Sequence, residues 1–371
     1  MPLIQYLTRI PFDFGAISTL SDEIERLGLK RPLLVTDKGV ADAGILERAL
    51  AAAKPSEPVV YDGTTENPTE QSLLECLEIW RDRGCDGVIA LGGGSPIDLA
   101  KAVALLTSHG GKLSDYNVKT AGPDAIGKVS PQIAIPTAAG TGAEVGRAAV
   151  MSLLDGSKSV AVSLNMVADV VICDPELTLS LPPRLTAATG VDAMSHGIET
   201  YCSSWINPPA AAIGSDAAAR AAKWLPVAVQ EGSNREARWE MMMAALMGGM
   251  CLQKSLGAAH AMANPLGELH LHHGTLIGIL LPHVARFNHA HATEAMRELC
   301  QAMQVKDGVG LDDWLHNFIG DLGLPARLGD LGVSEDQLNA IAVKASKDHL
   351  SASNPRPASE ADYATLLRAA L

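Results

Sequence analysis

The sequence predicts an α/β domain followed by an all-helical domain. In the first half, short runs rich in Val, Ile and Leu end in turn or polar residues, and longer helical patterns follow them, as in a layer of parallel strands and helices. After Leu181-Pro182-Pro183 we find no convincing strand, and long Ala-, Met- and Leu-rich stretches such as 235–263 indicate helices. The predicted strands lie at 32–37, 58–62, 87–91, 133–137 and 170–174.

The chain length supports a division into two domains. A single hydrophobic core stops growing near ~250–300 residues, and this chain has 371. Consecutive prolines disfavour helix in the residues before them and mark a junction between elements, so we place the boundary at Pro182-Pro183. We therefore expect an α/β domain over 1–182 and a helical domain over 183–371.

The composition excludes several classes of protein. With 47% hydrophobic and 19% charged residues, the chain is neither disordered nor fibrous. A net charge of −13 makes nucleic acid and acidic membranes poor partners, and no apolar run is long enough to span a bilayer. The first ten residues lack an export signal, and the six cysteines form no close pair. We expect a cytoplasmic protein.

A glycine-rich turn follows the third predicted strand. Residues 87–101 read as a strand, the turn Gly92-Gly93-Gly94 and a helix start with Ser95 and Asp98. Glycines let the backbone approach a ligand, and free N–H groups at a helix start favour an anion such as pyrophosphate. The segment matches neither GxGxxG nor the Walker pattern, so an empty strand-to-helix turn stays an alternative.

Two further features belong to the same predicted sheet edge. Asp37 ends the first strand, where a carboxylate can bind an adenosine ribose and repel a 2′-phosphate, which favours NAD over NADP. A capping role for Asp37 is equally compatible with the spacing. A second turn with Thr137 and Thr141 follows the fourth strand, and two such turns on one edge favour a nucleotide site.

An acid and three histidines in the second half form a candidate metal site. Asp192 and His196 are four residues apart in a helical pattern, which places both side chains on one helix face. His260 lies in a helical stretch, and His273 precedes Gly274. One carboxylate and three imidazoles suit Fe²⁺ or Zn²⁺ and leave room for a substrate. Each also has an ordinary interpretation, as a hydrogen-bonded helix pair or a satisfied core histidine.

Four sequence blocks resemble the iron-containing (group III) alcohol dehydrogenase family over nearly the whole chain. They are GGGSPIDLAKA at 92–102, PTAAGTGAEV at 136–145, DPELTLSLPPRLTAATGVDAMSHGIETY at 174–201 and HGTLIGILLPHVARFN at 273–288. The opening YLTRIPFDFGA and the block CDPELTLSLP look closest to the 4-hydroxybutyrate dehydrogenase branch.

The resemblance implies an N-terminal dinucleotide domain and a helical domain of the dehydroquinate synthase-like type, with NAD and a metal ion as cofactors. It also implies a small alcohol or aldehyde substrate and a homodimer or larger homo-oligomer. The implied metal ligands are Asp192, His196, His260 and His273. The implied cofactor contacts are Asp37, Gly93, Gly94, Ser95, Asp98, Thr137, Thr141 and Lys158.

Two departures from the family pattern bear on the chemistry. Where the family usually reads HAxAHPLG, this chain has Asn264, which can hydrogen-bond but cannot pass on a proton. The segment 267–273 is also one residue shorter, so His272 competes with His273 for the last ligand position; we prefer His273 because Gly274 follows it.

The resemblance predicts hydride transfer between a substrate carbon and nicotinamide C4, with the metal as Lewis acid. A metal-independent ketone reductase resembling the maleylacetate reductases is one alternative. A lyase like dehydroquinate synthase, which retains its NAD, is a second. An NAD-binding relative whose dehydrogenase activity is altered or lost because of Asn264 is a third.

Overall fold

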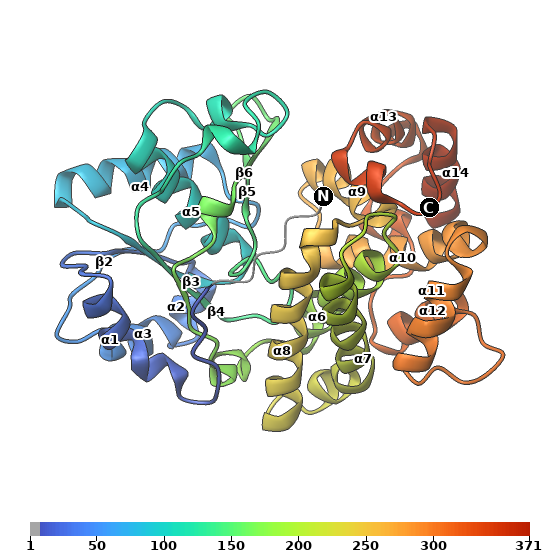
Figure 1. Cartoon of the computed structure of the whole chain (residues 1–371), viewed down its shortest axis with the longest axis horizontal. Helices are drawn as coiled ribbons and strands as arrows, with labels where there is room; N and C mark the ends of the chain where they lie inside the picture. The colour runs from blue at the N-terminus through green and yellow to red at the C-terminus, as the bar shows by residue number, and fades with distance from the viewer. Residues whose placement is uncertain (1–7) are drawn as a thin grey trace. The chain divides into compact units, whose positions relative to one another are not determined.

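The computed structural model describes residues 8–371 and divides them into two units (Figure 1). The α/β unit contains 8–138 and 142–180, and the helical unit contains 139–141 and 181–371. The chain passes from one to the other at 180–181, close to the prolines singled out above. That each half folds as an independent domain stays a prediction.

The α/β unit is built on a parallel five-stranded sheet, as the sequence predicts. Its strand order is β2-β1-β3-β4-β7, and each strand lies within or overlaps one of the five predicted runs. Gly92 at the end of β3 is in register with Pro136 at the end of β4, so the two Gly/Thr turns begin side by side at one edge. The strands are β1 (Leu33–Val35), β2 (Val59–Tyr61), β3 (Val88–Gly92), β4 (Gln132–Pro136) and β7 (Val170–Val171).

Both faces of this sheet are buried. Val35 and Ala90 point into a core formed with α4 and α5, whereas Leu34 and Ile89 point into a core formed with α1 and α3, as the two-residue period of a strand requires. Figure 1 shows these two sets of helices on opposite sides of the strands. The helices are α1 (Leu20–Arg26), α2 (Lys38–Asp42), α3 (Ile45–Ala52), α4 (Glu70–Arg83) and α5 (Gly94–His109).

An antiparallel hairpin was not expected from the sequence. Strands β5 (Ala148–Ser152) and β6 (Lys158–Val162) pair with each other, and Ala149 and Met151 turn inward. Alanine is a poor strand former, so β5 has little propensity signal of its own. Its packing against α5 stabilises the strand that its residues alone do not favour.

In the described part of the second unit, all regular secondary structure is helical, which confirms the predicted fold class. The stretch 235–263, which the sequence indicates as helical, is interrupted between Cys251 and Ala258, where Ser255 has φ +66°. Helix-forming residues on both sides hide this break. The helices are α6 (Pro183–Cys202), α7 (Pro208–Gln230), α8 (Arg235–Cys251), α9 (Ala258–Leu266), α10 (His273–Asn288), α11 (Thr293–Ala302), α12 (Leu311–Asp321), α13 (Glu335–Ser346) and α14 (Glu360–Ala370).

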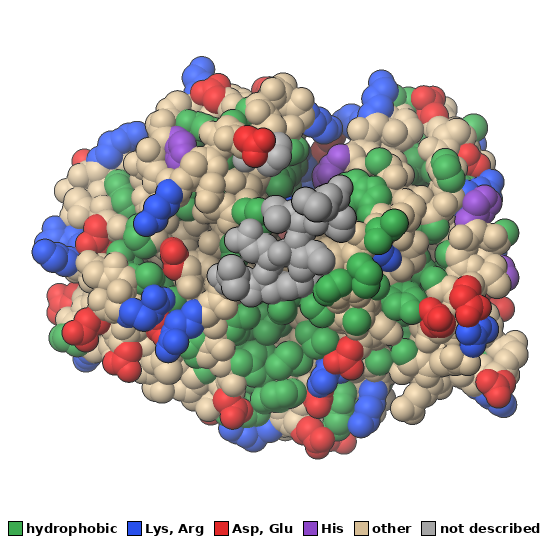
Figure 2. All heavy atoms as spheres, in the orientation of Figure 1, with side chains coloured by type: hydrophobic (Ala, Val, Ile, Leu, Met, Phe, Trp, Pro, Cys, Tyr) green, Lys and Arg blue, Asp and Glu red, His purple; other side chains and the backbone are tan. Residues whose placement is uncertain are grey.

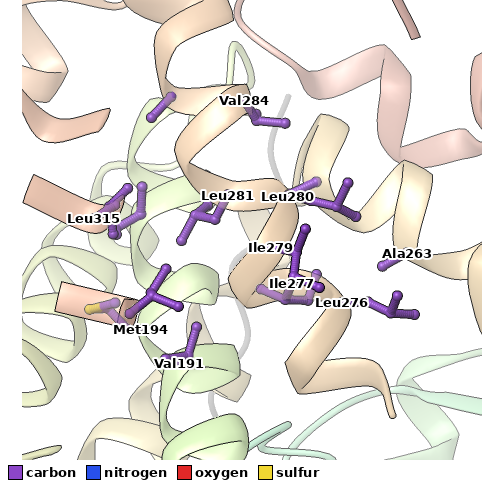
Figure 3. Close-up of a cluster of buried hydrophobic side chains, with 14 of the residues drawn as sticks. Val191, Met194, Ala263, Leu276, Ile277, Ile279, Leu280, Leu281, Val284 and Leu315 are labelled. Carbon is purple, nitrogen blue, oxygen red and sulfur yellow. The ribbon is translucent and has the colours of Figure 1, made fainter. Parts of the chain in front are cut away.

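Helix α10 lies at the centre of the helical core. Figure 3 shows its apolar side chains between Val191 and Met194 of α6, Ala263 of α9 and Leu315 of α12. The packing fixes α6, α9 and α10 against one another, and these three helices carry the four candidate metal ligands.

The described surface gives no sign of a membrane span. Within residues 8–371, no helix combines the length and the apolarity that crossing a bilayer requires. On the face drawn in Figure 2, basic and acidic side chains are interspersed over the part of the chain that is described.

Candidate metal centre and dinucleotide-binding edge

Helix α6 presents three polar side chains on one buried face. Asp192, His196 and Glu199 are spaced by four and three residues, which aligns them along the helix. All three are at most 5% exposed. Burying so many polar groups costs free energy unless they are paired or bind an ion, so this face is unusual for a core helix.

Two histidines reach Asp192 from neighbouring helices. His260 is the third residue of α9, and His273 is the first residue of α10. The start of α10 passes so close to α6 that a Cβ on Gly274 would lie 2.2 Å from the carbonyl oxygen of Ala188. Glycine at 274 therefore permits the approach that brings His273 to the acid.

The four side chains meet around one oxygen. Asp192 Oδ1 lies 3.5 Å from His260 Nε2, 3.5 Å from His273 Nε2 and 3.7 Å from His196 Nε2. One ligand atom each of Asp192, His260 and His273 lies within 4.8 Å of the other two. His196 contacts the acid without belonging to this mutually close set of three.

The donor atoms fit a bound divalent ion. Asp192 Oδ1 and His260 Nε2 are buried without a hydrogen-bond partner among the described residues. Metal–ligand bonds of about 2.1 Å in a tetrahedron separate the ligand atoms by about 3.4 Å, close to the distances observed here. The donor set of one carboxylate and three imidazoles suits Fe²⁺ or Zn²⁺. His273 is 37% exposed, which leaves this side of the centre open to a small molecule.

The electrostatics of the centre depend on the same contacts. Burial alone would raise the pKa of Asp192, but His196, His273 and His260 together lower it below its ordinary value. Burial lowers the pKa of His196 to about 4, which favours the neutral imidazole that binds metals. Burial also opposes a charge on His260, but Asp192 and Glu199 outweigh it and raise its pKa to about 9.

His272 has a different role from His273. It is the N-cap residue of α10, and its Nδ1 accepts from the backbone N–H of Thr275 at 3.3 Å. Among the described contacts, it is His273 that lies beside Asp192.

The glycine turn of the α/β unit leaves backbone amides at the start of α5. The N-cap residue, Gly93, has no side chain to satisfy the first N–H groups, and a Cβ placed there would meet nothing within 4 Å. Gly94 and Ser95 form the first turn of the helix and are partly exposed. This combination of free amides and open space suits an anion.

Asp37 borders this turn. Its Oδ1 accepts from the N–H of Val40 at 3.0 Å and so caps α2, the second role that the sequence allowed. Its Oδ2 would lie 3.4 Å from a Cβ on Gly92, where φ is +150°. The capping role therefore uses one oxygen and leaves the other facing the glycine turn.

The remaining predicted cofactor residues differ in burial and in their hydrogen bonds. Thr137 is buried, and its N–H donates to the carbonyl of Gly92. Thr141 is exposed within the short segment 139–141 assigned to the helical unit. Lys158 opens β6. Asp98 lies in α5, with Oδ2 accepting from the N–H of Val150 at 3.2 Å, so it ties the glycine-loop helix to the hairpin.

A buried lysine binds the backbone that follows the second turn. Lys101 of α5 donates from Nζ to the carbonyl oxygens of Ala143, Gly146 and Ala148. Burial lowers its pKa to about 8, although Asp98 and Glu144 act in the opposite direction. Burial raises the pKa of Glu144 to about 7 against the opposing effects of its own backbone hydrogen bond and Lys101.

Two family models together match almost the whole chain. The model described as iron-containing alcohol dehydrogenase matches residues 8–175, and the model of the family's C-terminal part matches 186–371. The chain belongs to the iron-containing alcohol dehydrogenase family. It is an NAD-dependent oxidoreductase of that type.

Known members are similar over their full length. A 4-hydroxybutyrate dehydrogenase from Cupriavidus necator is 44% identical, with 99% of each chain covered. The crystal structure of a 1,3-propanediol oxidoreductase superposes with a TM-score of 0.93 at 35% identity, covering all of both chains. A sulfoacetaldehyde reductase from Bifidobacterium kashiwanohense, solved in complex with NAD+, gives 0.90 at 31% identity, covering 99% of this chain and 98% of that one.

Sequence reasoning missed one residue of this dehydrogenase's candidate metal centre. Glu199 Oε2 pairs with His260 Nδ1 at 2.5 Å, and its Oε1 accepts from the N–H of Ala259 at 2.9 Å. A carboxylate on the far nitrogen of a metal-binding histidine fixes the ring orientation and the tautomer. The signal was present, because Glu199 follows His196 by three residues on the same face.

Asn264, the departure from the dehydrogenase pattern, forms a hydrogen bond with a carboxylate outside the set of four candidate ligands. It lies one turn after His260 on α9, and its Nδ2 donates to Asp348 Oδ2 at 3.0 Å. Burial alone would raise the pKa of Asp348, but His349, the N–H of Leu350 and Asn264 together lower it. Asn264 therefore stabilises a carboxylate and supplies no titratable group.

Proposed function

We propose that this dehydrogenase interconverts 4-hydroxybutyrate and succinic semialdehyde, or a similar ω-hydroxy acid and its aldehyde, with NAD as hydride carrier. The proposal is supported by the similarity over the full chain to a protein described as 4-hydroxybutyrate dehydrogenase. The observation that carries the chemistry is that Asp192 Oδ1 and His260 Nε2, 3.5 Å apart, are both buried without a hydrogen-bond partner among the described residues.

We assign the metal to Asp192, His196, His260 and His273. A divalent ion bound there supplies Lewis-acid polarisation of a substrate oxygen. Asp192 contributes the negative charge of the centre, and Glu199 holds His260 with Nε2 directed at Asp192. The partial exposure of His273 gives the substrate oxygen a side from which to approach.

We assign the pyrophosphate of NAD to the start of α5. The N–H groups near Gly93, Gly94 and Ser95 would bind its oxygens, and Asp37 would accept from the adenosine ribose. Asp98 and Thr137 hold this turn in place through Val150 and Gly92. Thr141 and Lys158 stay predictions as nicotinamide-side contacts.

Proton transfer cannot use a histidine at position 264. Asn264 can orient a water or a substrate group, and the hydroxyl proton would leave through water, the cofactor ribose or His270 or His272. His270 is exposed, and His272 is partly buried with Nδ1 bonded to Thr275. Of these two, His270 has the freer access to solvent.

The test combines metal analysis with turnover. Purified protein, its His260→Ala variant and the surface control His291→Ala are assayed for bound Fe and Zn and for NADH oxidation with succinic semialdehyde, 3-hydroxypropanal and acetaldehyde. We expect one ion per chain and a preference for the semialdehyde in the wild type and the control. His260→Ala should lose the ion and at least about 10³-fold in kcat/KM, since it removes transition-state charge stabilisation. Unchanged turnover in a metal-free variant would refute the Lewis-acid role.

A second experiment tests position 264, where this chain has asparagine in place of the family's usual histidine. If Asn264→His raises turnover of 4-hydroxybutyrate more than about tenfold, the native enzyme is adapted to another substrate or impaired in proton transfer. If turnover changes little, Asn264 is compatible with the proposed reaction.

We also infer a homodimer or larger oligomer and a cytoplasmic location. The family resemblance supports the first. All six cysteines are free thiols, which supports a reducing compartment. Sedimentation of the purified protein and fractionation of expressing cells test these points.

A further inference from the structure

Two buried residues near the C-terminus contact the turn that leads into α9. Ser353 Oγ lies 2.8 Å from both Ser255 Oγ and the carbonyl oxygen of Leu256. Asn354 Oδ1 accepts from the N–H of Ala258, the first residue of α9, at 3.1 Å. Asn354 is 3% exposed. The chain thus returns nearly 100 residues later to hold the helix that carries His260.

The start of α9 depends on these contacts because it has no cap of its own. Its N-cap residue is Gly257, and a Cβ there would lie 2.8 Å from Asn354 Oδ1 and 2.9 Å from Glu199 Oε1. Asn354 binds the N–H of Ala258, and Glu199 binds that of Ala259. Two side chains distant in sequence therefore satisfy N–H groups that a local cap normally satisfies.

The turn before α9 is strained. Ser255 has φ +66°, a conformation that costs free energy for a residue with a Cβ. Its carbonyl accepts from Thr200 Oγ1 of α6 at 3.1 Å, and its hydroxyl contacts Ser353. Such a conformation persists only where neighbours hold it, so the direction in which α9 begins is set by α6 and the C-terminal segment together.

The same asparagine also holds α10. Asn354 and Asn288 exchange two amide hydrogen bonds, of 3.0 Å and 2.7 Å, and Asn354 Nδ2 donates to the carbonyl of Arg356 at 2.6 Å. Asn288 is the last residue of α10, and His273 is the first. Asn354 thus uses both acceptor positions and both donors, with no capacity left over.

We propose that Asn354 is a positioning residue of the metal centre. It fixes the beginning of α9 and the end of α10 at once, and through these helices sets the placement of His260 relative to His273. Its hydrogen bonds to these helices run to the backbone of α9 and to the last residue of α10, so it acts on the two histidines through the helices that carry them. The inference rests on the metal ligands proposed above.

The test compares variants of the full-length protein reconstituted with Zn²⁺. Asn354→Ala removes all four hydrogen bonds. Asn354→Asp keeps the acceptor for Ala258 but cannot donate to Asn288 or to the carbonyl of Arg356. Asn165→Ala is the control, because Asn165 is an exposed asparagine of the α/β unit whose Nδ2 donates to the carbonyl of Ile126. Two quantities are measured for each: the Zn²⁺ dissociation constant, by chelator competition, and the thermal midpoint of the metal-free protein.

We expect Asn354→Ala to bind Zn²⁺ about 10- to 100-fold more weakly, in the range found when outer partners of metal ligands are removed, and Asn354→Asp to be intermediate. Asn165→Ala should lower the thermal midpoint without changing the Zn²⁺ dissociation constant. The inference is overturned if Asn354→Ala and Asn354→Asp retain wild-type Zn²⁺ affinity, whatever their midpoints. If the wild type itself binds no stoichiometric ion, the proposed ligand set fails, and this inference fails with it.

Discussion

The candidate metal centre is made of side chains, whereas the glycine-turn edge is made mainly of backbone. The candidate centre consists of side chains from α6, α9 and α10, and two of its facing atoms, Asp192 Oδ1 and His260 Nε2, are buried without hydrogen-bond partners among the described residues. The edge consists of backbone, with Gly93 as an N-cap residue that has no side chain and empty space where a Cβ would be. In the helical unit, the candidate site is therefore recognised by buried polar atoms that lack hydrogen-bond partners. In the α/β unit, it is recognised by the absence of a side chain and by the open space beside the backbone.

This difference predicts how each region responds to substitution. The centre is tightly packed, so small changes around it should disturb both the fold and the metal. The edge is open, so small changes there should alter cofactor binding alone.

The largest effect is expected for Gly274→Ala. The new Cβ would lie 2.2 Å from the carbonyl oxygen of Ala188, so the start of α10 must move away from α6 and carry His273 with it. We expect a loss of about 3 kcal/mol in stability, much weaker metal binding and about 10²-fold lower kcat/KM. Gly278→Ala is the control in the same helix, since its Cβ would find its nearest neighbour at 3.5 Å. Equal behaviour of the two variants in metal analysis and turnover would contradict the close-approach argument.

Glu199→Gln should have the next largest effect. Glutamine keeps an oxygen for the N–H of Ala259 but carries no charge to orient and polarise His260. We expect about 10- to 100-fold weaker metal binding with little change in the affinity for NADH. Metal titration and NADH fluorescence measured on one preparation separate the two quantities, and a loss of NADH binding alone would argue against this role.

Most of the fold could be predicted from the sequence, because its signals are local. Each strand of the parallel sheet lies within or overlaps a run of Val, Ile and Leu, and proline pairs and glycines stand near the element ends. The hairpin Ala148–Val162 and the break at Ser255 escaped notice. In both, tertiary packing overrides a weak or misleading propensity: alanines form a strand against α5, and a serine adopts positive φ between α6 and the C-terminal segment.

The residues of the candidate metal site could be proposed from the sequence, but the residues that hold its helices in place could not. Asp192 and His196 share a helix face by spacing, whereas His260 and His273 were candidates without such a spacing argument, and the family resemblance implied all four as ligands. Asn354 could not be inferred, because its contacts to Ala258 and Asn288 span 96 and 66 residues and carry no periodic signal. Long-range hydrogen bonds of this kind become visible only when the helices are packed.

Gly93→Ala tests the open edge. The added methyl group meets no atom within 4 Å, and the backbone at Gly93 has an extended conformation that alanine adopts. We expect unchanged thermal stability and metal content, but a KM for NAD about tenfold higher, because the methyl group would occupy space that a bound pyrophosphate needs. An unchanged KM would place the pyrophosphate elsewhere.

Asp37→Asn should have a smaller and more selective effect. Asparagine caps a helix as well as aspartate does, so α2 and the thermal midpoint should be preserved. The variant loses the charge that would repel a 2′-phosphate. We expect the ratio of kcat/KM for NADP to that for NAD to rise by about tenfold. If the ratio is unchanged while stability falls, the carboxylate serves only as a cap.

The smallest effect is expected beneath the second turn, where Glu144 has a pKa raised to about 7 mainly by burial. Its ordinary value is 4.5, so between these two pH values the native state keeps a proton that the unfolded state releases. Stability must then fall as pH rises through this window, by at most about 1.4 kcal/mol per pH unit for one group. Glutamine resembles the protonated acid and cannot titrate, so Glu144→Gln should match the wild type near pH 5 and exceed its thermal midpoint near pH 8. Asp98, with a pKa raised to about 6, makes stability depend on pH in the same direction. Because Asp98 is present in both proteins, only the difference between their thermal midpoints reports on Glu144.

Parallel midpoint curves from pH 5 to 8 would contradict this prediction. They would mean that Glu144 is ionised throughout and paired with Lys101, so that an ion pair, and not a neutral acid, lies beside the second turn.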